Sequence, residues 1–223
     1  ILPLERRHAL IELCESYGVL ILEDECYSDL VWDGKRPQAM RGITGDDRVI
    51  YVGSFSKSIA PALRLGYIVA GWPVMSRLLS LKTDSGTGAI DQMVIAEYCE
   101  AHFDNHVVKL RKTLKRKLDA MVEAVGANFG TAAEFDYPDG GIFLWIKLPD
   151  SVDTAKLFQA ASKEGVTLNP GAEWSVDPAY GQSRLRLCFA NPTEQTIREG
   201  VAKLAEICNR EFGVPTRIAN VGR

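Results

Sequence analysis

The chain has 223 residues, of which 46% are hydrophobic and 25% are charged, a globular composition with enough length for one large or two modest hydrophobic cores. Its 26 basic and 29 acidic residues leave a formal net charge of -3, which gives no reason to expect nucleic acid or a membrane as a partner. The 5 cysteines lie far apart with no C-x-x-C pair, and no stretch approaches the roughly 18 apolar residues of a membrane span. We therefore expect a cytoplasmic protein without a disulfide framework or a metal site.

The first elements alternate between helix and strand. Residues 3–18 combine periodic apolar positions with Pro3 at the start and Gly18 after the end, which predicts an amphipathic helix. Its expected inward positions are Leu10, Leu13, Cys14 and Tyr17. Apolar runs near residues 19–23, 48–53 and 66–71 then predict buried parallel strands of an α/β sheet.

A helical region is expected from about Pro73 to Gly126, with interruptions around residues 84–88 and near His102 to Asn105. A basic run from Lys109 to Lys117 lies within it and could be taken for a nucleic-acid surface. Apolar residues recur every three or four positions through the same segment, so the basic side chains are predicted to occupy the solvated face of an amphipathic helix.

The texture of the sequence changes from about Ala132. Short apolar strands and helical segments alternate there and end in a helix predicted from Thr193 to Phe212, which indicates a smaller α+β domain. We therefore expect two domains, residues 1–105 and residues 106–223, with the connecting helix assigned to the second.

Polar side chains follow two of the predicted strands. Asp24 ends the first strand and the segment from Ser54 to Lys57 ends the second, at the sheet edge where open α/β proteins bind ligands. Loss of water in such a crevice favours the neutral amine of Lys57, the form that attacks a carbonyl carbon. Lys57 is therefore a candidate imine-forming lysine.

An aldehyde cofactor with a phosphate group would also explain the neighbouring residues. Ser54, Ser56 and the amides of a helix start could donate hydrogen bonds to the phosphate, and Arg64 could add a charged fork. Asp24 could keep a pyridine nitrogen protonated, and Tyr27 could hydrogen-bond a ring hydroxyl. A protonated ring of this kind is an electron sink for a carbanion.

These residues lie in motifs that read, in chain order, "DECY", "SFSKSIAPALRLGY", "GGIFLWIKLP", "NPGAEW" and "RLRLCFANP". With them the chain resembles the fold type I, pyridoxal-phosphate-dependent aminotransferases of the class I and II branch. The resemblance implies the PLP-transferase fold type I: part of a large, mostly parallel-sheet α/β domain, followed by a smaller α+β C-terminal domain. It also implies pyridoxal 5'-phosphate as the cofactor.

The resemblance assigns roles to the candidate residues. Lys57 corresponds to the lysine that binds the cofactor and later moves the Cα proton, Asp24 to the partner of the pyridine nitrogen, and Tyr27 to the partner of the 3-hydroxyl. The implied phosphate ligands are Ser54, Ser56 and Arg64. Arg186 matches the arginine that binds the substrate α-carboxylate; it alternates with Arg184, and which of the two points inward depends on the strand register.

The resemblance further implies transfer of an amino group from an L-amino acid to a 2-oxo acid by a ping-pong mechanism, in a homodimer. The motif texture is nearest to relatives that handle 2-aminoadipate, kynurenine, aromatic or branched-chain amino acids. Family members also have an upstream glycine-containing phosphate loop, an aromatic ring that stacks on the cofactor and an Asn-Pro-x-Gly turn. The chain opens after these features, so we expect it to be the C-terminal part of an aminotransferase and to be incomplete as an enzyme by itself.

Other functions fit the motifs less well. The same fold type serves as the effector-binding half of some transcription regulators, and lyases and decarboxylases share it too. The S-x-x-K pattern of Ser54 to Lys57 is that of penicillin-recognising hydrolases, but the S-D-N and K-T-G partners are missing. A phosphate-binding P-loop is disfavoured because Ser56 and Tyr51 stand where its glycines belong.

Overall fold

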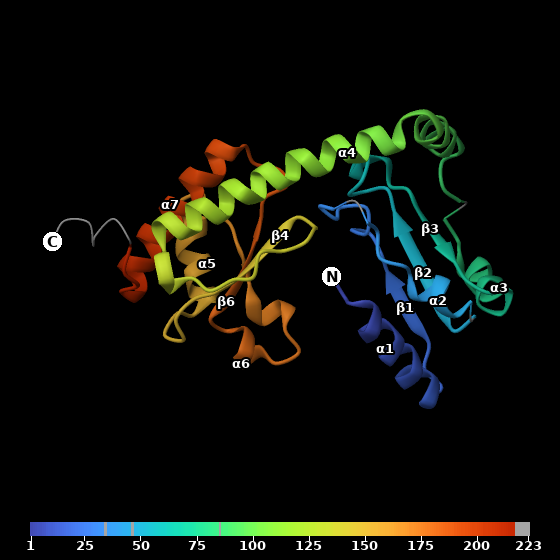
Figure 1. The fold of residues 1–223 in the computed structure, drawn as a ribbon, viewed down its shortest axis with the longest axis horizontal. Coiled ribbons are helices and arrows are strands. Elements are labelled where there is room, and N and C mark those ends of the chain that lie inside the picture. The colour runs from blue at the N-terminus through green and yellow to red at the C-terminus, as the bar shows by residue number, and fades with distance from the viewer. Residues whose placement is uncertain (34, 46, 85, 217–223) are drawn as a thin grey trace. The chain divides into compact units, whose positions relative to one another are not determined.

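The computed structural model describes residues 1–33, 35–45, 47–84 and 86–216 (Figure 1). The chain folds as two compact units. Unit 1 comprises Ile1–Arg111 together with Asp139–Gly141, and unit 2 comprises Lys112–Pro138 and the described chain from Ile142 onward. The last residues of the expected second domain, 217–223, lie outside the described residues.

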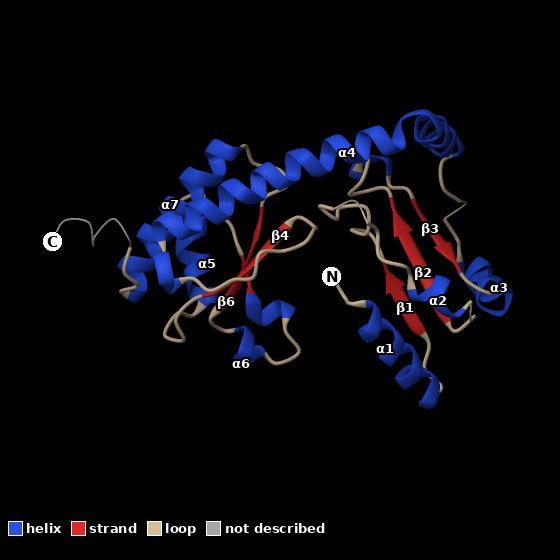
Figure 2. Ribbon diagram, in the orientation of Figure 1, coloured by secondary structure: helices blue, strands red, loops and turns tan. Residues whose placement is uncertain are grey.

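Figure 2 shows helices and strands in both units. Up to the unit boundary the elements are α1 (Leu4–Ser16), β1 (Ile21–Asp24), α2 (Met40–Thr44), β2 (Val49–Ser54), η1 (Pro61–Leu63), β3 (Gly66–Val69), α3 (Trp72–Leu81) and the long helix α4 (Ala89–Asn128). They are followed by η2 (Gly130–Ala132), β4 (Phe143–Lys147), α5 (Thr154–Lys163), β5 (Asn169–Pro170), η3 (Gly171–Trp174), α6 (Pro178–Gly181), β6 (Arg184–Cys188) and α7 (Glu194–Phe212). None of the helices in the described ranges combines the length and the apolar content that crossing a bilayer requires.

The sheet of unit 1 has the strand order β1-β2-β3. Strands β1 and β2 are parallel, as predicted, with Asp24 opposite Val52. Strand β3 is antiparallel to β2, with Gly66 opposite Ser54, so the prediction of a third parallel strand is wrong. The reason is the connection: residues 55–65 contain one short 3-10 helix, whereas a parallel return needs a crossover of about a dozen residues or more, usually helical.

One face of this sheet packs on α1 and α2. Ile21, Met40 and Val49 form a buried cluster against Ile11 and Cys14 of α1. The helix therefore turns a different face inward from the predicted one, although Pro3 precedes it and Gly18 follows it in the left-handed region as expected. Three of the predicted inward residues are exposed instead, namely Leu10, Leu13 and Tyr17.

Helix α4 is continuous from Ala89 to Asn128, so the predicted break near His102 to Asn105 is wrong. That segment contains neither proline nor glycine, and its polar residues are compatible with a helix. The other predicted interruption is confirmed, because α3 ends at Leu81 before α4 begins. The apolar residues along the basic run are largely buried, which confirms the amphipathic interpretation; the buried members are Val107, Leu114, Leu118, Met121 and Val125.

Unit 2 contains an antiparallel sheet with the order β4-β6-β5. Leu144, Ile146, Leu185 and Leu187 alternate along β4 and β6 and are buried, so one face of this sheet contributes to the core. The final helix has the ends that its sequence predicts. Thr193 caps the N-terminus of α7 by accepting a hydrogen bond from the amide of Thr196, and Gly213 closes its C-terminus with a φ of 69°.

Candidate active site

Asp24, Tyr27 and Lys57 lie at the carboxyl end of the parallel strand pair. Asp24 is the last residue of β1, is exposed, and accepts a hydrogen bond from the amide of Cys26 at 3.2 Å. The ammonium nitrogen of Lys57 lies 5.9 Å from the centre of the Tyr27 ring. The structure therefore brings a carboxylate, a phenol and an amine together at the sheet edge predicted from the sequence.

The thiol of Cys26 reports on the charges around it. Its pKa is raised to about 11, first by burial and then by the adjacent Asp24 carboxylate, while Lys57 acts in the opposite direction. The Asp24 carboxylate and the Lys57 ammonium group therefore both influence the pKa of this thiol. At neutral pH this cysteine is a protonated thiol, so it is no nucleophile in its resting state.

The segment after β2 folds as a tight turn that presents Lys57. The Ser54 hydroxyl oxygen accepts a hydrogen bond from the amide of Ser56 at 3.1 Å, and the amides of Ile59 and Ala60 both donate to the Phe55 carbonyl oxygen. Residues 56–59 are a turn and not the start of a helix, so the predicted row of helix-start amides is replaced by the amides of this turn.

The environment of Lys57 differs from the prediction. Its side chain is exposed, so the desolvation expected from the sequence is not present among the described residues. The neighbouring Ser58, in contrast to Lys57, is buried. It is 2% exposed, and its hydroxyl oxygen has no hydrogen-bond partner among the described residues.

Arg64 holds a strained backbone. It has a φ of 51°, and it is the only non-glycine residue at positive φ in the part of the chain that the structure describes. Its side chain is exposed and donates to the Pro61 carbonyl oxygen at 3.2 Å. A non-glycine residue in the left-handed region costs about 1 kcal/mol or more and is found preferentially at functional sites.

A cavity of about 430 Å³ lies beside Ser54 within unit 1. Its other lining residues include Arg36, Phe55 and Tyr67, with part of the 99–105 segment of α4. Asp24, Tyr27 and Lys57 do not line this cavity, whereas Ser54, one of the predicted phosphate ligands, does.

Arg186 is located in unit 2, on β6. Its guanidinium carbon lies 3.4 Å from the centre of the Trp174 ring and 3.8 Å from that of Phe143, so the two aromatic rings enclose it. The Nε atom is buried and has no hydrogen-bond acceptor among the described residues. An arginine held in this way keeps unused donor capacity for an anion.

Arg184 lies on the same face of β6 as Arg186, because residues two apart in a strand share a face and Leu185 and Leu187 are buried on the other. The sequence-based idea that register would turn only one of them inward is therefore wrong. Their partners distinguish them. Arg184 lies 3.6 Å above the Tyr180 ring and donates to the Tyr180 carbonyl oxygen, whereas Arg186 retains an unpaired donor.

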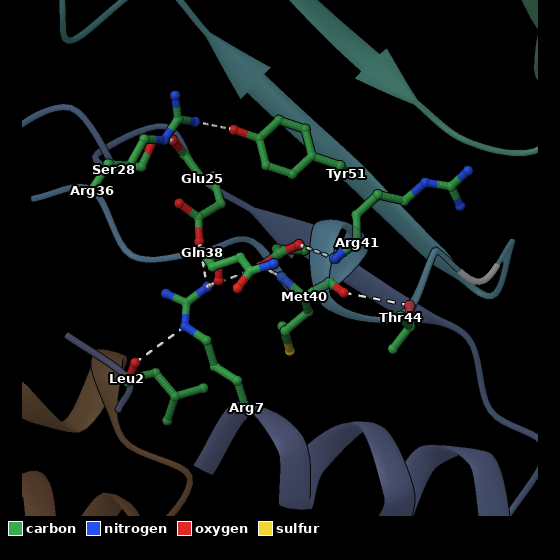
Figure 3. A network of polar contacts seen from close by, with 11 residues as sticks. Leu2, Arg7, Glu25, Ser28, Arg36, Gln38, Met40, Arg41, Thr44 and Tyr51 are labelled. Carbon is green, nitrogen blue, oxygen red and sulfur yellow. Dashed lines mark hydrogen bonds and ion pairs between the residues drawn. The ribbon is translucent and has the colours of Figure 1, made fainter. Parts of the chain in front are cut away.

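Sequence reasoning missed a polar cluster around the buried Arg7, which Figure 3 shows. Arg7 of α1 contacts both Glu23 and Glu25, which flank Asp24 in the sequence. The run of three consecutive carboxylates at Glu23, Asp24 and Glu25 was the available signal, because a buried carboxylate such as that of Glu23 requires a cation. The location of that cation on α1 could not be read from the local sequence, because the partners are 16 and 18 residues apart.

The architecture and the motif positions are those of a fold type I pyridoxal-phosphate-dependent protein. Residues 1–204 match the family model for aminotransferase class I and II, and the chain belongs to that family. The α-aminoadipate aminotransferase LysN from Thermus thermophilus superposes with a TM-score of 0.86 at 28% identity, covering 96% of this chain and 56% of that one.

Curated relatives include both enzymes and regulators by name. The aromatic-amino-acid aminotransferase 1 of Thermococcus litoralis is 32% identical over 93% of this chain and 50% of its own length. An HTH-type transcriptional regulator of Bacillus subtilis, YdfD, is 30% identical over 90% of this chain and 42% of its own length. The chain thus spans about half the length of the curated relatives it matches, or less.

Proposed function

We propose that this protein is a pyridoxal-phosphate-dependent aminotransferase that moves an amino group from an L-amino acid to a 2-oxo acid by a ping-pong mechanism. The observation that supports it most is the grouping of Asp24, Tyr27 and Lys57 at the carboxyl end of two parallel strands, in a chain of the aminotransferase class I and II family. An anion, a phenol and an amine at one sheet edge are the groups that this chemistry requires.

The residues present fit pyridoxal 5'-phosphate. The Asp24 carboxylate and the Lys57 amine both act on the Cys26 thiol, and the Lys57 nitrogen lies 5.9 Å from the centre of the Tyr27 ring. The Ser54 and Ser56 turn and the strained Arg64 supply hydroxyls, amides and a cation for a phosphate. When bound, the cofactor supplies an electron sink for the negative charge that develops at the substrate Cα.

Each residue has a distinct task in this proposal. The Lys57 amine holds the cofactor at rest and, once released, carries the proton that leaves the substrate Cα. The Asp24 carboxylate keeps a proton on the nitrogen of the cofactor ring. The Tyr27 hydroxyl orients that ring by hydrogen bonding to its 3-hydroxyl group. Arg186 binds the substrate α-carboxylate, for which its unpaired Nε and its planar fork are suited.

The substrate class, partners and organisation are part of the same proposal. The names of similar proteins, an aromatic-amino-acid aminotransferase and an α-aminoadipate aminotransferase, support an L-amino acid with a long or aromatic side chain as amino donor. We propose a cytoplasmic homodimer in which residues 1–105 belong to the cofactor-binding domain and residues 106–223 form the small domain.

Spectroscopy with pyridoxal phosphate tests the assignment of Lys57. The purified protein is expected to develop the absorbance band of covalently bound cofactor, and Lys57→Ala is expected to abolish that band while leaving the fold intact by circular dichroism. Lys82→Ala is the matched control, because Lys82 is an exposed lysine paired with Asp84 at 2.7 Å. A band that persists in Lys57→Ala would show that another residue binds the cofactor.

A second candidate function is a cofactor-binding sensor half of a transcription regulator, which the similarity to YdfD supports. Product analysis separates the candidates. Formation of a 2-oxo acid together with a new amino acid supports transamination, and release of carbon dioxide identifies a decarboxylase. Covalent cofactor binding with no turnover across a panel of amino acids supports the sensor.

A further inference from the structure

A buried arginine binds both sequence neighbours of the candidate cofactor residue Asp24. Arg7 is 6% exposed, and its Nη1 atom lies 3.1 Å from Glu23 Oε1, 3.0 Å from Glu25 Oε1 and 3.2 Å from the Gln38 carbonyl oxygen. Its Nε atom donates to the Leu2 carbonyl oxygen at 3.1 Å, as Figure 3 shows. The guanidinium is therefore fixed from several sides.

The two carboxylates that Arg7 binds are the sequence neighbours of Asp24. Glu23 lies on the covered face of β1, and strand alternation places Asp24 on the opposite face. Glu25 reaches the same guanidinium from beyond the strand end, while its amide donates to the Val52 carbonyl oxygen at 3.0 Å. One cation thus fixes the chain on both sides of the residue assigned to the cofactor ring.

Glu23 is held a second time. Its carboxylate accepts hydrogen bonds from the amides of Met40 at 2.7 Å and Arg41 at 3.1 Å, so α1, β1 and α2 meet at this one side chain. A carboxylate with this many donors has little freedom to rotate. Without Arg7, the buried Glu23 carboxylate and the partly buried Glu25 carboxylate would lose the cation that they share and would repel each other.

We propose that Arg7 is a positioning residue: it acts through Glu23 and Glu25 to aim the Asp24 carboxylate at the ring nitrogen of the cofactor. The inference rests on the proposed function, because it concerns how Asp24 meets that cofactor. It adds a residue that touches neither cofactor nor substrate and that lies outside the motifs of the cofactor site. Supporting contacts of this kind typically change affinity or activity about tenfold or more when removed.

A double-mutant cycle on pyridoxal phosphate affinity tests the proposal. Arg7→Met is expected to raise the dissociation constant of pyridoxal phosphate about tenfold and to shift the absorbance spectrum of the bound cofactor in the same direction as Asp24→Asn. In the Asp24→Asn background, Arg7→Met is expected to add less than about twofold, because its effect passes through the Asp24 carboxylate. Arg7→Lys, which keeps the charge, is expected to restore part of the affinity and of the spectrum.

Arg48→Met is the matched control. Arg48 also joins α1 to the sheet through an arginine-glutamate pair, to Glu15 at 2.7 Å, but that pair is exposed and away from the end of β1. It is expected to leave the affinity and the spectrum unchanged. If Arg7→Met does not fold, Glu25→Gln takes its place in the cycle, because it leaves the Arg7 and Glu23 pair intact.

The outcomes separate the two proposals. Wild-type affinity and spectrum in Arg7→Met, or effects of Arg7 and Asp24 that multiply independently, would overturn the positioning role while leaving the proposed function standing. Failure of the unsubstituted protein to bind pyridoxal phosphate covalently would overturn both. Non-additive effects together with the Asp24→Asn spectrum would support the positioning role.

Discussion

Removal of one of the two aromatic rings that enclose the Arg186 guanidinium should weaken substrate binding by a modest and calculable factor. The Trp174 ring lies 3.4 Å from the guanidinium carbon and Phe143 lies on it at 3.8 Å, so Trp174→Leu leaves one ring in place. Trp174 is 53% exposed, which puts the cation-π contact near about 0.5–1 kcal/mol, the range of exposed pairs. Since about 1.4 kcal/mol is a factor of ten, the expected loss in carboxylate affinity is about two- to fivefold.

Steady-state kinetics measure this loss. KM for the amino acid and the inhibition constant of a carboxylate analogue without an amino group should rise together in Trp174→Leu, with kcat nearly unchanged. Trp174→Phe keeps an aromatic face and should lie close to the unsubstituted protein. The control is Tyr180→Leu, which removes the matching ring from Arg184 and should not change KM. Equal effects of Tyr180→Leu and Trp174→Leu, or an unchanged KM in Trp174→Leu, would refute the role assigned to the aromatic pair.

Three further predictions concern unit 1 and the long helix. Arg7→Met should lower the free energy of unfolding by about 3–5 kcal/mol in denaturant titrations, because it leaves the buried Glu23 carboxylate without its cation. Arg48→Met removes an exposed ion pair and should cost less than about 1 kcal/mol. Equal losses in the two variants would contradict this account. Gly140→Ala should lower the free energy of unfolding by about 1–3 kcal/mol, because the added Cβ would collide with the Leu30 carbonyl oxygen. Gly126→Ala adds a Cβ in open space on α4 and should raise the free energy of unfolding by up to about 1 kcal/mol. Thermal melts of the two variants measure these changes. Burial and the Asp24 carboxylate raise the pKa of the Cys26 thiol to about 11, so the reactive thiolate forms only at high pH. Alkylation followed by peptide mass spectrometry should therefore show little labelling of Cys26 at pH 8 and a steep rise toward pH 11. Full labelling at pH 7 would contradict the raised pKa.

Local patterns predicted much of the fold because their information lies within a few residues. Strands β1, β2 and β6 follow from apolar runs and alternation, and α7 follows from its periodicity and its capping residues. The direction of β3 does not follow in this way, because an apolar tetrapeptide reads the same in a parallel and an antiparallel pair. The inward face of α1 was also missed, since a buried arginine occupies a position where periodicity calls for an apolar residue.

In the candidate site too, features set by the local sequence could be predicted, and features set by distant contacts could not. Asp24, Tyr27 and Lys57 could be placed together because strand ends meet at one sheet edge. The exposure of Lys57 could not be predicted, because burial depends on every segment that packs nearby. The difference between Arg184 and Arg186 depends on Tyr180 and Trp174, whose contacts with β6 come from loops and short helices that the strand pattern does not describe.

The acidic run Glu23, Asp24 and Glu25 carries a risk during folding. Its side chains are chemically alike, and a slip of one residue in the pairing of β1 with β2 would exchange the faces of the carboxylates. The hydrophobic alternation of so short a strand offers little protection against that error. Arg7 discriminates between the two arrangements, because only the native one gives it two acceptors from a single strand end. The two ion pairs of Arg7 thus favour the native register over a slip of one residue.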